Sequence, residues 1–557
     1  MAVRIAFALL LLCGSTSAAE EPVTSLANAD LKFTVPKTGY HVLQRGDVTA
    51  VIVDNGAVDD GTLKGHRAGY SGVASLTHKK RSENLFVPNY AGLNYEHIHD
   101  GTTQNRDILF EPRRAPMELR VISPHIVELY QAPSPTWKLE SVLRYEMLDD
   151  GTIEMTLECI PRAKTFRNDY VGLFWASYIH QPESLDIHFR GHKNSDRDKV
   201  SWVRGVTPSH GVLSTHVAAD DKREFKHDEK FPLTLAFNRS KHLYAEPWYY
   251  GVSHDLALIQ MFRPQDDIRL TQSPSGGGNG NPAWDFQFFI PNYKVGQLYR
   301  MVMRAQYVPF ESHKQIQRAS RANRLALGHR IDKDEREAAV QSLRKAGVQL
   351  TTNDAGQISG VSFSKQTATR ENLHQLSALA HLETVRLFEA DATDETVQLL
   401  RPIPHLKSLD LGFGQRLTDA SIEELVRHRE LTFLNLGFGR RLTNSGFVRL
   451  ANLPNLSVLN LSVTSLTDEA MPQIGKIESL TSLDIDRTRV TNVGLKYLLK
   501  LPKLRALRLV GIPMTDAGLL ELSKIRTLRH INLRDVAVSD EAIAEFRTRL
   551  PRCVIKR

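Results

Sequence analysis

The chain has 557 residues, of which 41% are hydrophobic and 24% charged, so it is long enough for two or three domains with cores of their own. Its formal net charge of +8 is modest for this length, and we interpret the Lys and Arg residues as spread among Asp and Glu. No basic arm, recognition-helix motif or base-stacking signature appears. These features exclude nucleic acid as an expected partner.

The N-terminus has the pattern of a secretory signal. Arg4 gives a positive start, residues 6–13 form a short apolar run, and residues 17–19 are small. We expect a signal peptide over 1–19, cleaved after Ala19. Lipidation at Cys13 is the alternative, but the large residue before it does not fit the usual lipoprotein site.

After the signal, no stretch approaches ~20 continuous apolar residues, which predicts no transmembrane segment. The remaining cysteines, Cys159 and Cys553, fall in different predicted domains, so the chain is expected to fold without relying on disulfides. We therefore expect an exported protein, periplasmic or secreted. Its oligomeric state is open.

Residues 25–310 predict an all-β domain. Short alternating apolar and polar stretches recur, with turn signals between them, and residues 145–155 form a nearly explicit hairpin around Asp149–Gly151. So many strands in ~280 residues favour a large two-sheet sandwich, which includes the supersandwich type. Fifteen of the twenty-one histidines precede residue 314.

Two segments, Gly172–Glu183 and Asn281–Pro291, carry Trp and aromatic residues in a texture that resembles the galactose-mutarotase-like supersandwich. That family includes sugar epimerases and domains of polysaccharide lyases. The resemblance implies a carbohydrate-directed domain. No His/Glu catalytic pair of the family aligns with specific positions, so no catalytic residue is carried over.

Flat apolar rings can stack on sugars, and Trp175, Trp248 and Trp284 are the candidates for sugar contact in this domain. Core residues of the sandwich are the alternative interpretation. The catalytic residues are unknown at this stage. No nucleophile, phosphate-binding or dinucleotide fingerprint appears, so no cofactor is expected.

His97 and His99 would point to one face of a strand, at the spacing of a metal-binding pair. A catalytic zinc ion normally needs three protein ligands. A third ligand cannot be assigned among the eligible residues, which are His180, Glu183, His188 and His192. Structural or surface histidines are the preferred interpretation, and no metal is expected.

Residues 311–345 are charged and helix-prone, and we interpret them as a helical linker and cap. The segment Glu335–Gly347 predicts a helix that ends at a glycine C-cap. A stack of repeats needs a polar cover at its end, so this helix is expected to cover the first repeat.

Residues 346–557 contain a repeat of 24 or 25 residues with the core L-x-x-L-x-L. A fixed period of this length predicts one strand and one helix per repeat, stacked so that neighbours share a core. The seven clear copies begin at Leu382, Leu406, Leu431, Leu456, Leu480, Leu504 and Leu528, and a degenerate copy begins at Ile358.

Each repeat continues with Ser or Thr followed by Asp or Asn, which is typical of a helix start. The first residues of these pairs are Thr393, Thr418, Thr443, Thr467, Thr491, Thr515 and Ser539. The pattern resembles the leucine-rich repeat family, in the short form abundant in secreted planctomycete proteins. It lacks the usual Asn or Cys ladder. The resemblance implies an α/β solenoid, a horseshoe with a parallel sheet on its concave face, which usually binds a ligand.

The residues between the leucines are expected to face outward from this sheet. They are Arg386, Asp410, Asn435, Asn460, Asp484, Arg508 and Asn532 in one row, with Asp486 and Arg534 in the next. One interpretation is a polar groove for a peptide or glycan. The other is a solvated sheet whose charges pair across strands.

Two near-duplicate loops follow the strands of the 25-residue repeats. Phe413 and Phe438 are expected to stack on each other, with Arg416 and Arg441 alongside. This would form an aromatic and basic patch. Alternatively, the phenylalanines tuck under the loops and brace the repeats.

The leading hypothesis is an exported, non-catalytic binding protein that recognises a protein or cell-surface polymer through its repeats. The rival is a carbohydrate-active enzyme or sugar-binding sandwich, with the repeats as a targeting module. A structural component of the cell envelope is the third hypothesis.

Overall fold

The computed structural model describes residues 23–103, 105–207, 212–274 and 280–557. The predicted signal peptide and Cys13 lie outside the described residues. The chain divides between Glu311 and Ser312 into two compact units, each treated separately below. With 31% of residues in strands and 19% in helices, the protein is β-rich and multidomain.

The first unit is built almost entirely from antiparallel strands. They are β1 Tyr40–Arg45, β2 Val48–Val53, β3 Gly72–His78, β4 Asn94–His99, β5 Met117–Ser123, β6 Ile126–Gln131, β7 Leu139–Met147, β8 Ile153–Pro161, β9 Tyr170–Ala176, β10 Ile187–His192, β11 Ser201–Gly205, β12 Thr215–His216, β13 Leu243–Ser253, β14 Leu256–Phe262, β15 Arg269–Ser273, β16 Ala283–Pro291 and β17 Tyr299–Pro309. Two one-turn helices, α1 Arg106–Leu109 and α2 Glu111–Arg114, lie between β4 and β5.

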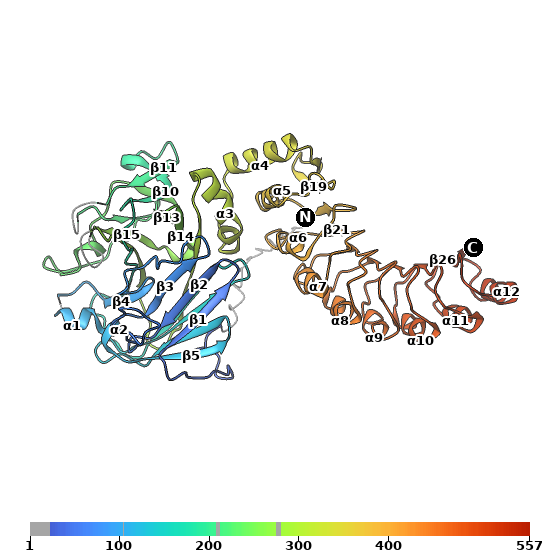
Figure 1. Ribbon diagram of the computed structural model, residues 1–557, viewed down its shortest axis with the longest axis horizontal. Helices are drawn as coiled ribbons and strands as arrows, with labels where there is room; N and C mark the ends of the chain where they lie inside the picture. The colour runs from blue at the N-terminus through green and yellow to red at the C-terminus, as the bar shows by residue number, and fades with distance from the viewer. Residues whose placement is uncertain (1–22, 104, 208–211, 275–279) are drawn as a thin grey trace, which may run out of the picture. The chain divides into compact units, whose positions relative to one another are not determined.

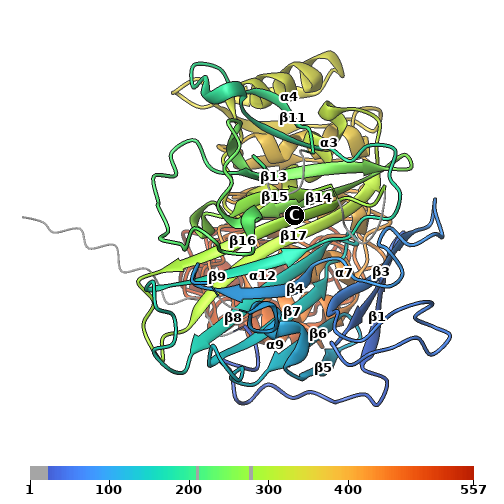
Figure 2. The same ribbon diagram turned by 90° about the vertical axis from the view of Figure 1, so that its left-hand side faces the viewer.

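Among the described residues of this unit, the strands form three sheets. Their orders are β11-β10-β13-β14-β17-β8-β7-β6-β5, β12-β15-β16-β9-β4 and β1-β2-β3. In Figure 2 the strands β4, β9 and β16 of the five-stranded sheet run side by side. The predicted hairpin is confirmed, since β7 pairs antiparallel with β8 and Tyr145 lies opposite Met155.

A single apolar core joins the nine-stranded and five-stranded sheets. It contains Tyr145 of β7 and Tyr249 of β13 from the larger sheet, and Trp175 of β9 and Phe286 of β16 from the smaller one. The rings of Trp175 and Phe286 stack at a centroid distance of 5.1 Å. Alternation along the strands thus directs the large aromatics into the space between two sheets.

The second unit begins with two helices, α3 His313–Ala326 and α4 Lys333–Lys345. Glu335 of α4 ties them together, because its carboxylate accepts hydrogen bonds from Arg321 at 2.5 Å and Arg324 at 3.0 Å. All three side chains are at most 5% exposed. The predicted helix over Glu335–Gly347 is confirmed, although it starts two residues earlier and ends at Lys345.

One ten-stranded sheet then runs through the repeats in chain order. Its strands are β18 Gln349–Thr352, β19 Ile358–Ser362, β20 Thr384–Arg386, β21 Ser408–Asp410, β22 Phe433–Asn435, β23 Val458–Asn460, β24 Ser482–Asp484, β25 Ala506–Arg508, β26 His530–Asn532 and β27 Val554–Lys556. From β19 onward every neighbouring pair is parallel and in register, so residues one repeat apart lie next to each other.

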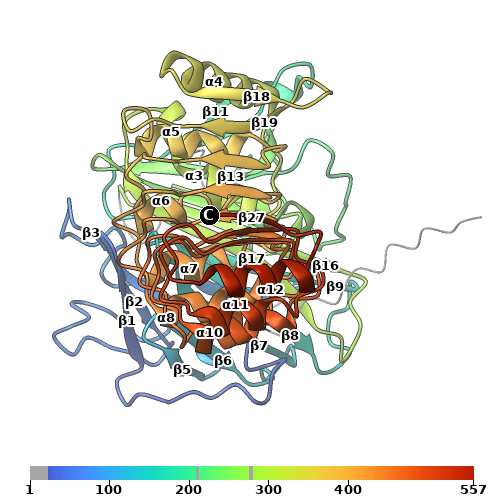
Figure 3. The ribbon, with the colours of Figure 1, turned by 90° about the vertical axis from the view of Figure 1, so that its right-hand side faces the viewer.

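Helices alternate with these strands and line up along one side of the sheet (Figures 1 and 3). They are α5 Arg370–Gln375, α6 Asp394–Gln398, α7 Asp419–Leu425, α8 Asn444–Phe447, α9 Met471–Ile474, α10 Asn492–Leu495, α11 Asp516–Leu522 and α12 Asp540–Arg549. The motif leucines are buried between strands and helices, with Leu406, Leu434 and Leu480 at 0% exposure. The predicted strand-plus-helix repeat is therefore confirmed.

The Asp or Asn of every Ser/Thr-Asp/Asn pair except the last has a role that the sequence did not reveal. Its side chain reaches the Thr or Ser that begins the helix of the next repeat. Asp468 accepts hydrogen bonds from the backbone N–H of Thr491 at 2.8 Å and from its hydroxyl at 2.6 Å. Equivalent contacts join Asp394 to Thr418, Asp419 to Thr443, Asn444 to Thr467, Asn492 to Thr515 and Asp516 to Ser539. We call this set of contacts the Thr/Asp ladder.

Cys159 and Cys553 are both buried and unpaired. Among the described residues, no helix has the length and apolar character needed to cross a membrane.

Candidate functional site

The predicted outward rows lie on the exposed side of the repeat sheet, but most of their polar side chains already have partners. Asp410, Asn460 and Asp484 each accept the backbone N–H two residues further along the chain. Asn435 and Asn532 do the same, and both are at most 9% exposed. Most side chains of the central row therefore accept hydrogen bonds from the backbone that directly follows their own strand.

The charges of this face pair across strands around Arg508. Its guanidinium lies 2.7 Å from Asp484 and 2.5 Å from Asp486, both on β24 or directly after it. Burial raises the pKa of Asp484. The backbone N–H of Asp486 and the guanidinium of Arg508 oppose this rise, while the negative charge of Asp486 adds to it. This part of the face matches the interpretation of a sheet with internally paired charges. Arg386 and Arg534 are exposed.

The two duplicate loops stack their aromatic rings as expected. The rings of Phe413 and Phe438 are parallel within 11°, with centroids 4.0 Å apart. Phe388, one repeat earlier, adds an edge-on contact to Phe413 at 5.1 Å and is 45% exposed. We call these three residues the phenylalanine column. It is a continuous aromatic surface across three repeats, in which the rings of Phe413 and Phe438 are half-buried.

The backbone of this column is strained. Phe413 and Phe438 have φ of 66°, in the left-handed region that bulky residues disfavour. The same position two and three repeats later holds Arg487 at 53° and Gly511 at 64°. The N–H of Phe413 still donates to the carbonyl of Gly437 at 2.9 Å, so the sheet hydrogen bonds hold the conformation. Phenylalanine thus occupies a position where glycine would fit at lower cost.

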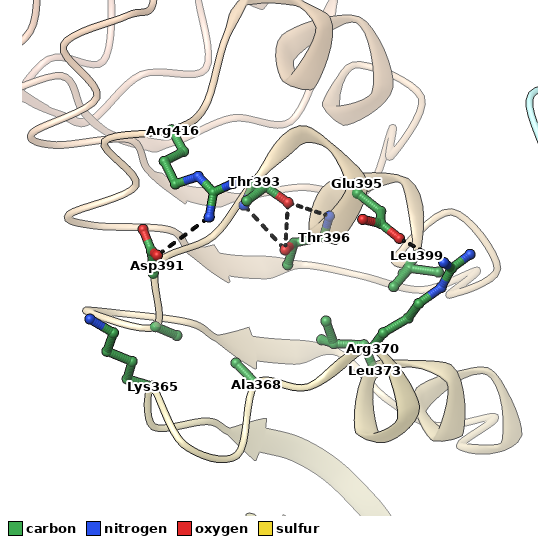
Figure 4. A pocket seen from close by; sticks show the side chains of 11 residues that line it. Lys365, Ala368, Arg370, Leu373, Asp391, Thr393, Glu395, Thr396, Leu399 and Arg416 are labelled. Carbon is green, nitrogen blue, oxygen red and sulfur yellow. Dashed lines mark hydrogen bonds and ion pairs between the residues drawn. The ribbon is translucent and has the colours of Figure 1, made fainter. Parts of the chain in front are cut away.

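A polar pocket of about 290 Å³ is lined by the loops that follow β19 and β20, by α5 and α6, and by Arg416 from the loop that carries Phe413 (Figure 4). Arg416 faces Asp391 across it at 3.6 Å, and Arg370 pairs with Glu395 at 3.2 Å. Of the predicted basic partners, Arg416 is therefore engaged at this pocket. Arg441 is exposed, and it contributes to lowering the pKa of Asp394, for which the hydroxyl of Ser421 is the leading favourable contact.

The three candidate sugar-stacking tryptophans are interior residues. Trp175, Trp248 and Trp284 are each 0% exposed, and so none of them presents a ring face to a ligand. Trp284 packs where Gly251 leaves room, since a Cβ on that glycine would lie 2.3 Å from the ring. The expectation of sugar contact is corrected here. Trp175 of β9 and Trp284 of β16 belong to the core between the sheets. Trp248 is next to Tyr249 on β13, so it points to the opposite face, where it packs on Trp202.

His97 and His99 are also buried, at 5% and 0% exposure. The ring of His97 packs on Phe110 and Phe174, and that of His99 on Phe231 and Phe289. Burial lowers the pKa of His99 to about 3, so its imidazole is neutral at physiological pH. Within the described residues, no group of three or more His, Cys, Asp or Glu residues is placed to hold a metal ion.

A different cluster in the first unit, missed by the sequence analysis, combines aromatic and charged groups at the surface. Tyr70, Tyr90 and Tyr178 are half-buried and pack ring against ring, with centroid distances of 4.7 to 6.0 Å. Arg113 lies over the Tyr70 ring at 3.9 Å. Its Nη1 is 3.2 Å from Oε1 of Glu96. We call these five residues the tyrosine cluster.

Glu96 owes its position to an irregularity in β4. Tyr95 lies opposite Trp175 and His97 opposite Phe174, so Glu96 is an extra residue in the pairing with β9. Such a bulge re-aims a side chain, and bulges are over-represented next to active sites. The Tyr178 hydroxyl donates to Oε1 of Glu96 at 2.5 Å. Tyr178 lies in the segment Gly172–Glu183, the one signal in the sequence that pointed to this region.

Burial sets the protonation of the groups around Glu96. It raises the pKa of the Tyr178 hydroxyl well above its ordinary value, with Glu96 adding to the effect. Burial also raises the pKa of Asp285 well above its usual range, since this carboxyl is 2% exposed. The tyrosine cluster can therefore offer neutral hydroxyl donors, ring faces and a fixed carboxylate–guanidinium pair to a polar ligand.

No protein-family model matches the chain, and no curated protein matches its sequence. Solved structures similar to it include a putative aldose 1-epimerase from Escherichia coli K12, with 11% identity and a TM-score of 0.30, covering 50% of this chain and 100% of that one. An internalin from Listeria monocytogenes has 14% identity and a TM-score of 0.25, covering 40% and 88%. The actin-binding site 2 of leiomodin-1 has 18% identity and a TM-score of 0.19, covering 23% and 86%.

Proposed function

We propose that the protein is an exported, non-catalytic binding protein whose repeats form a leucine-rich-repeat solenoid and dock a protein partner. The observation that carries the proposal is the phenylalanine column. Phe388 is 45% exposed, and the column continues through Phe413 and Phe438 on strained backbone. The left-handed conformation recurs at this position in the other repeats, so what distinguishes these two loops is the aromatic ring that each carries there.

The composition of this surface suits protein recognition. Large aromatic residues lose few rotamers on binding and give much apolar contact area, and arginine is enriched with them at protein interfaces. Arg416 and Arg441 supply exposed guanidinium groups in the same loops as the column. The polar pocket between Lys365 and Arg416 adds hydrogen-bonding groups at its edge.

The test replaces the column without disturbing the fold. Asparagine tolerates the left-handed conformation, so Phe413→Asn with Phe438→Asn removes the rings and keeps the loops. Val463→Asn is the matched control, because Val463 has φ of 55° at the same position one repeat later. Proteins crosslinked to the full chain in the extracytoplasmic fraction are quantified by mass spectrometry. We expect the specific set to fall about tenfold with the double variant and to stay unchanged with the control.

If the double variant captures the same set as the wild type, the phenylalanine column is a brace of the repeats and the proposal fails. The control guards against a general effect of asparagine in these loops. Far-UV circular dichroism of each variant shows whether the fold is retained.

A second candidate function, sugar binding or turnover by the first unit, rests on the tyrosine cluster. The bulge at Glu96 places a carboxylate beneath three packed tyrosine rings and beside Arg113. Aromatic faces with a fixed carboxylate are what a sugar ring requires. Titration with a panel of monosaccharides, followed by the intrinsic fluorescence of tyrosine, tests it.

Glu96→Gln and Tyr178→Phe are expected to abolish the response, whereas Tyr130→Phe, with a half-buried tyrosine on β6 that donates to Glu140, is expected to leave it unchanged. Anomer interconversion measured by NMR separates binding from turnover. No response to any sugar in the wild type excludes this second function.

A further inference from the structure

The positive charge of the protein is concentrated at the C-terminal end of the repeats. Residues 500–557 contain thirteen Lys or Arg and six Asp or Glu, a difference of +7 against +8 for the whole chain. The expectation that the cations are evenly spread is therefore wrong for this segment. This segment carries the last three strands, β25 to β27, and the last two helices, α11 and α12.

Part of this charge gathers on the strand side. Arg505 and Arg529 directly precede β25 and β26, and the N–H of Arg529 donates to the carbonyl of Arg505 at 2.8 Å, so the two residues are neighbours across the sheet. Lys556 of β27 lies opposite Asn532 of β26, and Arg534 follows two residues after Asn532. We call Arg505, Arg529, Arg534 and Lys556 the C-terminal cation group.

None of these four cations forms an ion pair with a carboxylate of the described residues. Arg529 donates only to the backbone carbonyls of Arg526 and Leu528. In contrast, Lys524 pairs with Glu521, Arg549 with Glu545 and Arg508 with Asp484. All four members of the group are exposed, including Lys556 at the end of β27.

Like charges on adjacent strands, about 4.8 Å apart, repel each other, and a sheet face normally sets opposite charges there. Arg505 and Arg529 stand in such a pair. A bound anion removes this repulsion, and a chain of anions removes it along the whole group. The arrangement is complementary to a linear polymer with one negative charge per unit.

The side chains around the C-terminal cation group indicate which kind of anionic polymer fits it. Single-stranded nucleic acid is held by exposed aromatic rings that stack with bases, in addition to basic side chains. Residues 500–557 contain one aromatic side chain, Phe546, and it is 0% exposed. The exposed side chains around the group are polar or cationic, apart from Val554 at 60% exposure. Such a surface suits carboxylate or sulfate groups on a sugar chain.

We propose that the C-terminal cation group is a binding site for an acidic polysaccharide. Arginine and lysine contact the carboxylates or sulfates, and the sheet spacing sets neighbouring contacts one strand apart. The site is separate from the phenylalanine column, so it can hold while the proposed protein docking fails.

The experiment measures the affinity of the full chain for oligogalacturonate and for size-matched neutral dextran, at several salt concentrations. The test variant is Arg505→Gln, Arg529→Gln and Lys556→Gln. The control is Lys524→Gln, Arg547→Gln and Arg549→Gln, which changes the net charge equally on the helix side. We expect the test variant to bind oligogalacturonate about tenfold more weakly, as for the loss of three exposed ion pairs, with the control unchanged.

Binding should also weaken with added salt, and less steeply in the test variant. An equal loss in the control, equal binding of dextran, or equally tight binding of single-stranded DNA of the same charge would overturn the proposal. The Phe413→Asn variant is expected to bind oligogalacturonate like the wild type, which separates this site from the protein-docking surface. Thermal unfolding of both triple variants confirms that they fold.

Discussion

Asp468 holds Thr491, one repeat further along the chain, through two hydrogen bonds, one to the hydroxyl at 2.6 Å and one to the backbone N–H at 2.8 Å. It also accepts the N–H of Gly494 at 3.0 Å. One carboxylate therefore binds donors at the start of the next helix, where backbone N–H groups lack the regular bond to the carbonyl four residues earlier.

Replacing Asp468 by alanine leaves these donors without a partner and should lower the free energy of unfolding of the second unit by about 1–3 kcal/mol. Asp468→Asn should cost much less, because Asn444 already makes the equivalent contact with Thr467. Hydrogen exchange of the repeat amides under increasing urea measures both. Asp354→Ala, in an exposed turn, is the control, and an equal effect there would refute the role of the Thr/Asp ladder.

Glu335→Ala should destabilise the start of the second unit by about 3–5 kcal/mol, because Arg321 and Arg324 would stay buried without their counter-charge. Glu337→Ala, two residues away and 59% exposed, should change stability by less than about 0.5 kcal/mol. Urea unfolding followed by hydrogen exchange in α3 and α4 distinguishes the two. Similar curves for both variants would show that the ion network adds nothing.

His99 should make the first unit sensitive to acid. Its folded-state pKa of about 3 lies below the unfolded value of about 6.5, so between these pH values the unfolded chain binds the additional proton. Stability is then complete above about pH 6.5 and decreases as the pH falls, by up to about 1.4 kcal/mol per pH unit.

His99→Phe should flatten this acid dependence, since the ring already sits among Phe231 and Phe289. His41→Phe, at an exposed imidazole, should not. Thermal unfolding of the variants between pH 4 and 8 checks the prediction. An unchanged slope in His99→Phe would assign the acid sensitivity to other groups, of which His216, with a pKa lowered by burial to about 4, is the first to examine.

Phe413→Gly should change the stability of the second unit by less than about 1 kcal/mol. Relief of the left-handed strain is worth about 1–2 kcal/mol, and the lost ring stacking about 0.5–1.5 kcal/mol in the other direction. Leu411→Ala, two residues earlier in the core, should cost about 2–5 kcal/mol. Chemical denaturation compares them. A large loss in Phe413→Gly would mean that the column braces the fold.

The repeats could be predicted from the sequence because one signal recurs in every turn. Leu382, Leu406 and Leu431 recur at spacings of 24 and 25 residues, and their burial follows from the period alone. The stacking of Phe413 on Phe438 followed in the same way, because in-register strands bring residues one repeat apart together. The partner of Asp468 could not be predicted, because the Thr-Asp pair is typical of an ordinary helix start and gives no sign of a contact with the next repeat.

The first unit was predicted only in outline, because alternation does not say which face of a strand meets the second sheet. Trp175 and Trp284 could equally have pointed outward, and the sequence offers nothing to decide it. The tyrosine cluster was out of reach for a different reason. Its members come from loops and strands between residues 70 and 178, and the bulge that turns Glu96 toward them leaves no mark on the alternating pattern.

The Thr/Asp ladder begins only at Asp394, because the preceding turn carries Arg370 in the corresponding place. Side-chain hydrogen bonds thus join neighbouring repeats at six consecutive positions. The first repeat has no such bond and depends on apolar contacts and on Glu335. Under tension or during a transient opening, unfolding would therefore start at the end where α4 and α5 meet. The repeats from Asp394 onward would then unfold together, as one cooperative unit.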